Sequence, residues 1–103
     1  YVDPDWTMPL PVRLAQSLGA TRVLAVDATA HLNNTPPGAE RYLASDQRKK
    51  ALVDTDGVLA DVLLKPDFGY WVSLSREFRE RAIDAGYRET MADAARLRAL
   101  HAV

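Results

Sequence analysis

Apolar residues fall in short runs and in helical stripes along the chain, and their spacing predicts alternating strands and helices. The segments 22–27 and 60–65 are short apolar runs with polar ends, which is typical of strands buried on both faces of a parallel sheet. Between the chain start and the first run, apolar residues recur at helical spacing: Leu10, Leu14, Ala15 and Leu18. They predict a helix over about 9–18, with Gly19 as the residue that follows its end.

Two further helices are predicted downstream. A polar helix over about 38–54 should turn its hydrophilic middle, 45–50, towards solvent and end before a turn at Asp56-Gly57. Ser75 can cap a final helix, within which Gly86 should weaken or close a part, and 94–100 should add another turn or two. The apolar stripe of this final helix consists of Phe78, Ala82, Ile83, Tyr87 and Met91.

The order of these elements indicates the fold class. Tyr1-Val2 has the pattern of a strand end, and helix, strand, helix, strand and helix follow it. Such alternation predicts an α/β domain, a parallel sheet with flanking helices and right-handed crossovers. Two or three strands are too few for a stable parallel sheet covered on both faces. We therefore expect residues 1–103 to be one portion of a single domain, with the rest of that domain N-terminal to Tyr1.

Composition excludes several classes of function. The chain has 103 residues, a formal net charge of -1 and no cysteine. Disulfide scaffolds, thiol nucleophiles and cysteine zinc sites are thereby excluded, and near-neutral charge gives no electrostatic reason to expect nucleic acid as a partner. Neither His31 nor His101 has a second ligand at metal spacing, so no metal is expected. No apolar run approaches the length of a membrane span, and the compartment is left open.

Acidic residues at the ends of strands are the candidates for chemistry. Asp3 and Asp5 directly follow the predicted strand end, and in open α/β sheets ligand and catalytic groups gather at that edge. The alternative is that Asp3 only starts a turn and caps backbone N–H groups. Asp27 ends the next strand, where two interpretations are open: it lines the site from the C-terminal edge of the sheet, or, as the favoured interpretation, it caps or orders the loop that follows.

A family resemblance adds to this picture. Residues 1–27, Tyr-Val-Asp-Pro-Asp-Trp-Thr-Met-Pro-Leu-Pro-Val through Leu-Gly-Ala to Val-Leu-Ala-Val-Asp, resemble the region around the catalytic Asp of patatin-like phospholipases. The segment 60–67, Ala-Asp-Val-Leu-Leu-Lys-Pro-Asp, is similar to the Ala-Asp-Val-x-Ile-x-Pro strand of that family. The segment 83–87, Ile-Asp-Ala-Gly-Tyr, is similar to its Ile-x-x-Gly-Tyr helix. Together the three segments span most of the chain, in the family's order.

The resemblance implies a patatin-like fold, related to the α/β-hydrolases, and a serine acyl hydrolase. The family uses a Ser–Asp dyad, of which only the Asp carries over, onto Asp3. No Gly-x-Ser-x-Gly elbow is present, so the serine and the glycine-rich oxyanion loop are expected N-terminal to Tyr1. The implied substrates are lipids or other acyl esters, reached through peripheral contact with a membrane, without metal or cofactor. Trp6, three residues from Asp3, is expected to line the substrate site.

One departure from the family keeps a second hypothesis open. Pro4 stands where the family has a glycine after its Asp, and proline forbids the positive φ that glycine allows. Either Pro4 holds the Asp3 loop in another usable shape, or this is a non-catalytic patatin-like domain with an interaction or regulatory role. A nucleotide-binding half-domain is a third hypothesis, disfavoured because the chain lacks both the Gly-x-Gly-x-x-Gly fingerprint and a P-loop.

Overall fold

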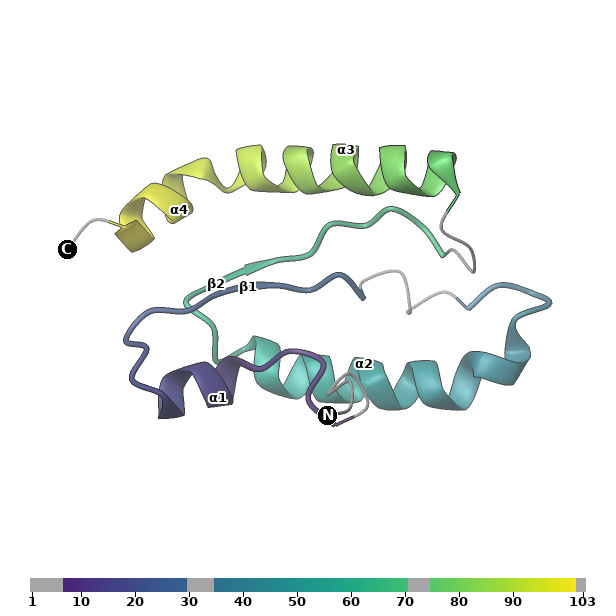
Figure 1. Ribbon diagram of the computed structural model, residues 1–103, viewed down its shortest axis with the longest axis horizontal. Coiled ribbons are helices and arrows are strands. Elements are labelled where there is room, and N and C mark those ends of the chain that lie inside the picture. The colour runs from purple at the N-terminus through teal and green to yellow at the C-terminus, as the bar shows by residue number, and fades with distance from the viewer. Residues whose placement is uncertain (1–6, 30–34, 71–74, 102–103) are drawn as a thin grey trace.

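The computed structural model describes residues 7–29, 35–70 and 75–101, which form a mixed α/β arrangement. Figure 1 shows three layers: α1 and α2 lie on one side of a small sheet, and α3 and α4 lie on the other. The elements in chain order are α1 (Val12–Ser17), β1 (Leu24–Val26), the 3-10 turn η3 (Glu40–Tyr42), α2 (Leu43–Gly57), β2 (Val62–Leu64), α3 (Arg76–Ala92) and α4 (Ala94–His101).

The two strands are parallel neighbours, as their apolar runs predicted. Leu24 pairs with Val62 and Val26 with Leu64 in register. At the end of β1, the Asp27 N–H donates to the Leu64 carbonyl at 2.8 Å. Helix α2 forms the connection between the strands, which is the helical crossover that a parallel pair requires.

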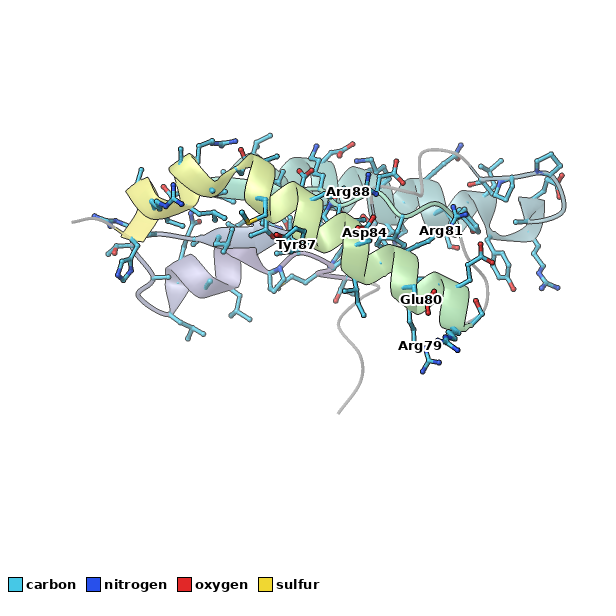
Figure 2. The ribbon with its side chains drawn as sticks, turned by 90° about the horizontal axis from the view of Figure 1, so that it is seen from above. Arg79, Glu80, Arg81, Asp84, Tyr87 and Arg88 are labelled. Carbon is cyan, nitrogen blue, oxygen red and sulfur yellow. The ribbon has the colours of Figure 1, made fainter. Side chains whose placement is uncertain are left out.

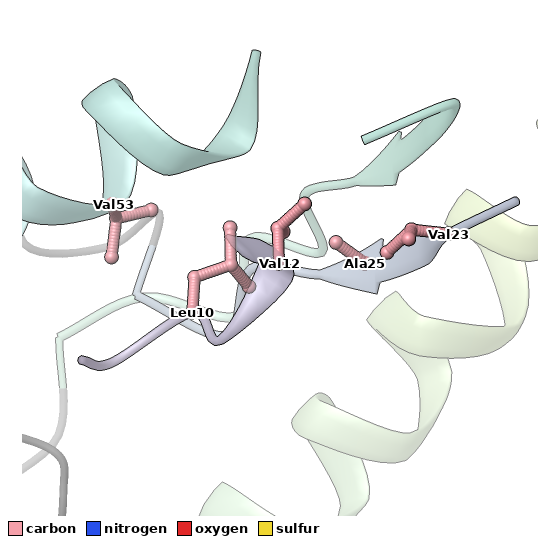
Figure 3. Close-up of a cluster of buried hydrophobic side chains, with 5 residues drawn as sticks. All are labelled: Leu10, Val12, Val23, Ala25 and Val53. Atoms are coloured by element: carbon pink, nitrogen blue, oxygen red, sulfur yellow. The ribbon is translucent and has the colours of Figure 1, made fainter. Parts of the chain in front are cut away.

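The core lies between the sheet and the layer of α1 and α2. Every second residue of the β1 region faces this layer, and Val23 and Ala25 are buried there. Figure 3 shows these two side chains on the β1 segment, with Val12 of α1 next to Ala25 and Val53 of α2 farther along the same layer. The cluster consists of Leu10, Val12, Val23, Ala25 and Val53.

The opposite face of the sheet is covered unevenly. On β2, Val62 and Leu64 are 3% and 4% exposed, and α4 packs against this strand. On β1, Leu24 and Val26 point to the same face but are 47% and 52% exposed. The expectation that 22–27 is buried on both faces is therefore wrong for this face, because the covering helix packs against β2.

Helix boundaries differ from those predicted at α1 and α2. Helix α1 begins at Val12, after Pro11, and Gly19 follows its end with the expected positive φ of 103°. Helix α2 continues through Asp56-Gly57, so the turn predicted there is wrong. Asp56 is only 2% exposed and pairs with Arg13, while a side chain at Gly57 would come within 3.1 Å of Leu63. Tertiary contacts thus keep Asp56-Gly57 in the helix, although the local sequence favours a turn there.

Helix α3 is longer and less buried than its pattern suggested. The Ser75 side chain accepts a hydrogen bond from the Phe78 N–H at 3.1 Å, so the predicted cap is confirmed. The expected break at Gly86 is wrong, because α3 runs on to Ala92. Ion pairs four residues apart, such as Arg88–Asp84 at 2.9 Å, help to offset the low helix propensity of glycine. In the apolar stripe, three members are exposed: Ile83, Tyr87 and Met91.

Candidate functional site

The sequence-predicted site residues lie outside the part of the chain that the structure describes. Asp3 and Trp6, together with Pro4 and Asp5, belong to the segment 1–6, for which the structure gives no geometry. The roles of Asp3 as general base and of Trp6 in substrate binding therefore stay predictions. What the structure does place is the carboxyl edge of the sheet, and the residues that follow β1 and β2 there.

Asp27 follows β1 and is almost completely buried, with 1% of its surface exposed. Its Oδ1 accepts hydrogen bonds from the Thr29 N–H at 2.8 Å and from the Thr29 hydroxyl at 2.5 Å. These bonds order the turn after β1, as expected for an aspartate in this position. Its second oxygen, Oδ2, is buried without a hydrogen-bond partner among residues 7–29, 35–70 and 75–101. Asp27 therefore shapes the carboxyl edge of β1.

Asp46 on α2 joins two loops at the same end of the molecule. Although the segment 45–50 was expected to face solvent, Asp46 is only 9% exposed. Its Oδ2 accepts hydrogen bonds from the Tyr70 hydroxyl at 2.6 Å and from the Thr35 hydroxyl at 3.2 Å. The hydrogen bond to Asp46, aided by burial, raises the pKa of Tyr70 to about 12. The shift extends the pH range over which the Tyr70 hydroxyl stays protonated and donates to Asp46.

The loop 65–70, which follows β2, is anchored at both ends and in its middle. At its start, the Lys65 N–H donates to Glu89 Oε1 on α3 at 3.1 Å. In its middle, the ring of Phe68 packs edge-on against the ring of Phe78, with centroids 5.5 Å apart. At its end, Tyr70 is bonded to Asp46. These contacts fix the loop against α3 at its start and middle and against α2 at its end.

A cavity of about 340 Å³ lies between this loop and α3. Three lining residues come from the loop and three from the helix: Asp67, Phe68, Gly69, Arg81, Asp84 and Arg88. Figure 2 shows how the three helical residues follow one another along α3. They are spaced three and four residues apart, so they share one face of the helix. The volume falls within the range of small-molecule sites, roughly 300–1,000 Å³.

The cavity wall carries two cations and two anions. Arg88 pairs with Asp84 at 2.9 Å, and Arg81 pairs with Glu77, which lies just outside the lining, at 3.3 Å. Asp67 Oδ1 accepts a hydrogen bond from the Gly69 N–H at 3.0 Å. Gly69 has a φ of 84°, a conformation that a side chain would strain. The wall can therefore offer guanidinium donors and carboxylate acceptors to one ligand.

Sequence reasoning did not single out this group of residues. The spacing of Arg81, Asp84 and Arg88 on one helical face was visible, but their meeting with the loop 65–70 was not. In the ranges that the structure describes, no cluster of three metal-ligating side chains occurs. Within those ranges there is also no helix of the length and apolarity that a bilayer crossing requires.

Comparisons of the chain with protein-family models, with curated proteins and with solved structures gave no match.

Proposed function

We propose that this chain is the C-terminal part of a patatin-like serine hydrolase that cleaves fatty acyl esters of lipids. The observation that carries the proposal is the ordered set of three segments, 1–27, 60–67 and 83–87, that resemble the family's pattern. The parallel pairing of β1 with β2 supports it, since two of these segments contain those strands. The coarse fold is α/β, and the patatin-like topology is part of the proposal.

The proposed reaction assigns one step to a residue of this chain. The carboxylate of Asp3 takes the proton from a serine hydroxyl, and the serine oxygen attacks the ester carbonyl. The ester C–O bond breaks, and the leaving alkoxide takes that proton from Asp3 and departs as the alcohol. Water then gives a proton to Asp3 as its oxygen attacks the acyl-serine, and the acyl–serine bond breaks to release the fatty acid while the proton returns to the serine oxygen. The serine and the oxyanion donors would come from residues N-terminal to Tyr1, and no metal or cofactor takes part. Trp6 would contact the acyl chain, and the enzyme would meet its lipid at a membrane surface.

The test compares two aspartates in the longer protein that contains this chain. Asp3→Asn keeps the side-chain shape but removes the proton acceptor, so kcat should fall by about 10²–10⁴-fold, the usual effect of losing a general base. Asp5→Asn is the matched control and should keep most of the activity. Both variants are checked by circular dichroism and assayed on a short p-nitrophenyl ester.

Either of two results would contradict the assignment. Full activity in Asp3→Asn removes Asp3 from the catalytic machinery. Activity lost only in Asp5→Asn shows that the loop is shifted by two residues from the proposed register.

A non-catalytic patatin-like domain with an interaction or regulatory role is the second candidate. The observation that favours it is Pro4, which replaces the family's glycine next to the Asp. Under this hypothesis the longer protein hydrolyses no ester even though it carries Asp3. Asp3→Asn then leaves the rate of p-nitrophenyl ester hydrolysis at background. The same assay on the unsubstituted protein therefore separates the two candidates.

A further inference from the structure

We propose that the cavity between the loop 65–70 and α3 is a binding site for a zwitterion that carries a phosphate and an ammonium group. A phospholipid headgroup of the phosphocholine type has this chemistry, and so does free phosphocholine. The choice of a lipid headgroup as the natural ligand rests on the proposed function. The binding chemistry rests on the cavity itself.

The lining residues match both ends of such a ligand. Arg81 and Arg88 lie seven residues apart on one face of α3, and guanidinium groups bind phosphate oxygens with paired donors. Asp84 lies between them on the helix, and Asp67 stands across from it on the loop, so carboxylates are available to an ammonium group. Phe68 adds an aromatic ring to the wall, and aromatic faces attract quaternary ammonium groups.

The charge balance of the wall favours a zwitterion over a simple ion. Arg81 and Arg88 are balanced by Asp67 and Asp84, so the lining has no net charge. A lone anion would be attracted by the arginines but repelled by the aspartates. A lone cation would be attracted by the aspartates but repelled by the arginines. A ligand with both charges can place each beside its complement.

The charged side chains of α3 are available for exchange with a ligand. Arg88 and Asp84 are 71% and 62% exposed, and Arg81 is 62% exposed. Ion pairs at such exposure contribute little to stability, so a ligand can replace them at small cost. The opposite wall is rigid, because its loop is tied to α3 at Lys65 and Phe68 and to α2 at Tyr70. A fixed wall lowers the ordering cost of binding.

The position of the cavity agrees with a substrate-related role. The loop 65–70 directly follows β2, so the cavity lies beyond the carboxyl ends of the parallel strands. This is the edge at which open α/β sheets gather their ligands. A headgroup held here would lie at the carboxyl edge of the sheet, which is the kind of edge at which the sequence predicts Asp3.

Binding is tested with phosphocholine on the same intact protein as the Asp3→Asn assay, after circular dichroism confirms that it is folded, by calorimetry and by amide chemical shifts in NMR spectra. Three variants are compared with the unsubstituted chain: Arg88→Gln, Asp84→Asn and Arg79→Gln. Arg79 is the matched control, because it sits on the same helix but lies on the opposite side from Arg81 and Arg88 (Figure 2). Inorganic phosphate and choline are titrated separately.

We expect phosphocholine to shift the amides of 67–69 and of α3, and to bind more tightly than phosphate or choline alone. Arg88→Gln should weaken phosphocholine binding by about three- to fivefold, the effect of losing one solvent-exposed charged contact. Asp84→Asn should weaken phosphocholine but not phosphate, and Arg79→Gln should leave binding within about twofold. No shift at the cavity, equal binding of phosphate and phosphocholine, or an equal loss in Arg79→Gln would overturn the site.

Phosphatidylcholine vesicles separate the two sources of the ligand. Binding of both vesicles and free phosphocholine supports the lipid headgroup. Binding of phosphocholine without vesicles supports the zwitterion site and overturns the lipid as its source. Because none of these measurements needs hydrolysis, their outcome is independent of the Asp3→Asn assay. The site and the proposed catalytic function can thus fail separately.

Discussion

At the scale of single residues, buried aspartates hold the loops of this molecule in place. Asp46 accepts hydrogen bonds from the hydroxyls of Thr35 and Tyr70, and Asp27 accepts two hydrogen bonds from Thr29. Asp56 Oδ1 lies 2.9 Å from Arg13 Nε, in an ion pair that lacks hydrogen-bond geometry. A buried carboxylate that loses its donors incurs a desolvation penalty. Removing the partners of these aspartates should therefore lower the free energy of unfolding.

Tyr70 gives this arrangement a measurable dependence on pH. The raised pKa of Tyr70, about 12 in the folded chain against an ordinary value near 10, means that folding favours the protonated hydroxyl. The stabilisation is therefore complete below about pH 10 and is lost as the pH rises towards about 12. Phenolate absorbance should show one tyrosine that titrates late, and Tyr70→Phe should remove that late step.

The same substitution has an expected effect on stability at neutral pH. Tyr70→Phe deletes the hydroxyl that donates to Asp46 and should lower the free energy of unfolding by about 1 kcal/mol. Tyr87→Phe is the control, because Tyr87 is 66% exposed on α3 and should leave both the late titration and the stability unchanged. A late titration that persists in Tyr70→Phe would contradict the role given to Asp46.

At the scale of elements, β1 is the strand with the most exposed apolar face and with backbone groups turned away from its partner strand. Val23 and Asp27 bond to β2 through their backbone, and alternation along a strand turns the backbone groups of Leu24 and Val26 to the other edge. The side chains of Leu24 and Val26 are also about half exposed. An apolar cavity of about 150 Å³ lies beside this strand, between it and α1. Among residues 7–29, 35–70 and 75–101 no strand pairs with this edge of β1, and an open edge favours association with further strands.

Two lysine substitutions on adjacent residues of β1 test this description. Val26→Lys places the charge on the exposed face and should change the free energy of unfolding by no more than about 0.5 kcal/mol. Ala25→Lys forces an unpaired charge into the core and should cost more than about 3 kcal/mol or prevent folding. Urea unfolding followed by circular dichroism measures both, and similar losses in the two variants would contradict the assigned faces.

At the scale of the whole molecule, the chain is less compact than its length allows. Its radius of gyration is 14.8 Å and its extents are 48 × 29 × 24 Å, whereas a compact domain of this length has a radius of gyration near 13 Å. Figure 1 shows the reason: long helical layers flank a sheet of two short strands. The sheet is too small to bury the faces of both layers, which leaves α3 with exposed Ile83, Tyr87 and Met91.

This shape and the absence of a nucleophile elbow lead to one prediction for the isolated chain. The 103 residues alone should hydrolyse no ester above background and should unfold at low temperature or low urea, because the small core and open sheet edge supply little stabilisation. Esterase assays and thermal unfolding measure the two properties. Clear turnover that a serine-directed inhibitor abolishes would show that the catalytic parts lie within these residues.

The alternation of elements could be predicted from the sequence, because it depends on local chemistry. The apolar runs at 22–27 and 60–65 contain β1 and β2, and the helix-length polar segment between them becomes α2. Ser75 caps α3 by a bond to a residue three positions away, so its role is visible in the sequence. Gly19 ends α1 for a similar local reason, its tolerance of positive φ.

Tertiary structure alone decided the features that join distant segments. Asp46 and Tyr70 are 24 residues apart, and their hydrogen bond buries a carboxylate in a helix that the sequence marks as solvated. The 340 Å³ cavity exists because α3 runs back along the loop that follows β2 (Figure 1), a contact that no periodicity encodes. The exposure of Leu24 and Val26 likewise depends on the strand that α4 covers. Which segments are strands and which are helices can be predicted from local patterns, because caps and periodic burial act over a few residues. Which side chains meet depends on packing across the whole chain, so only the fold shows it.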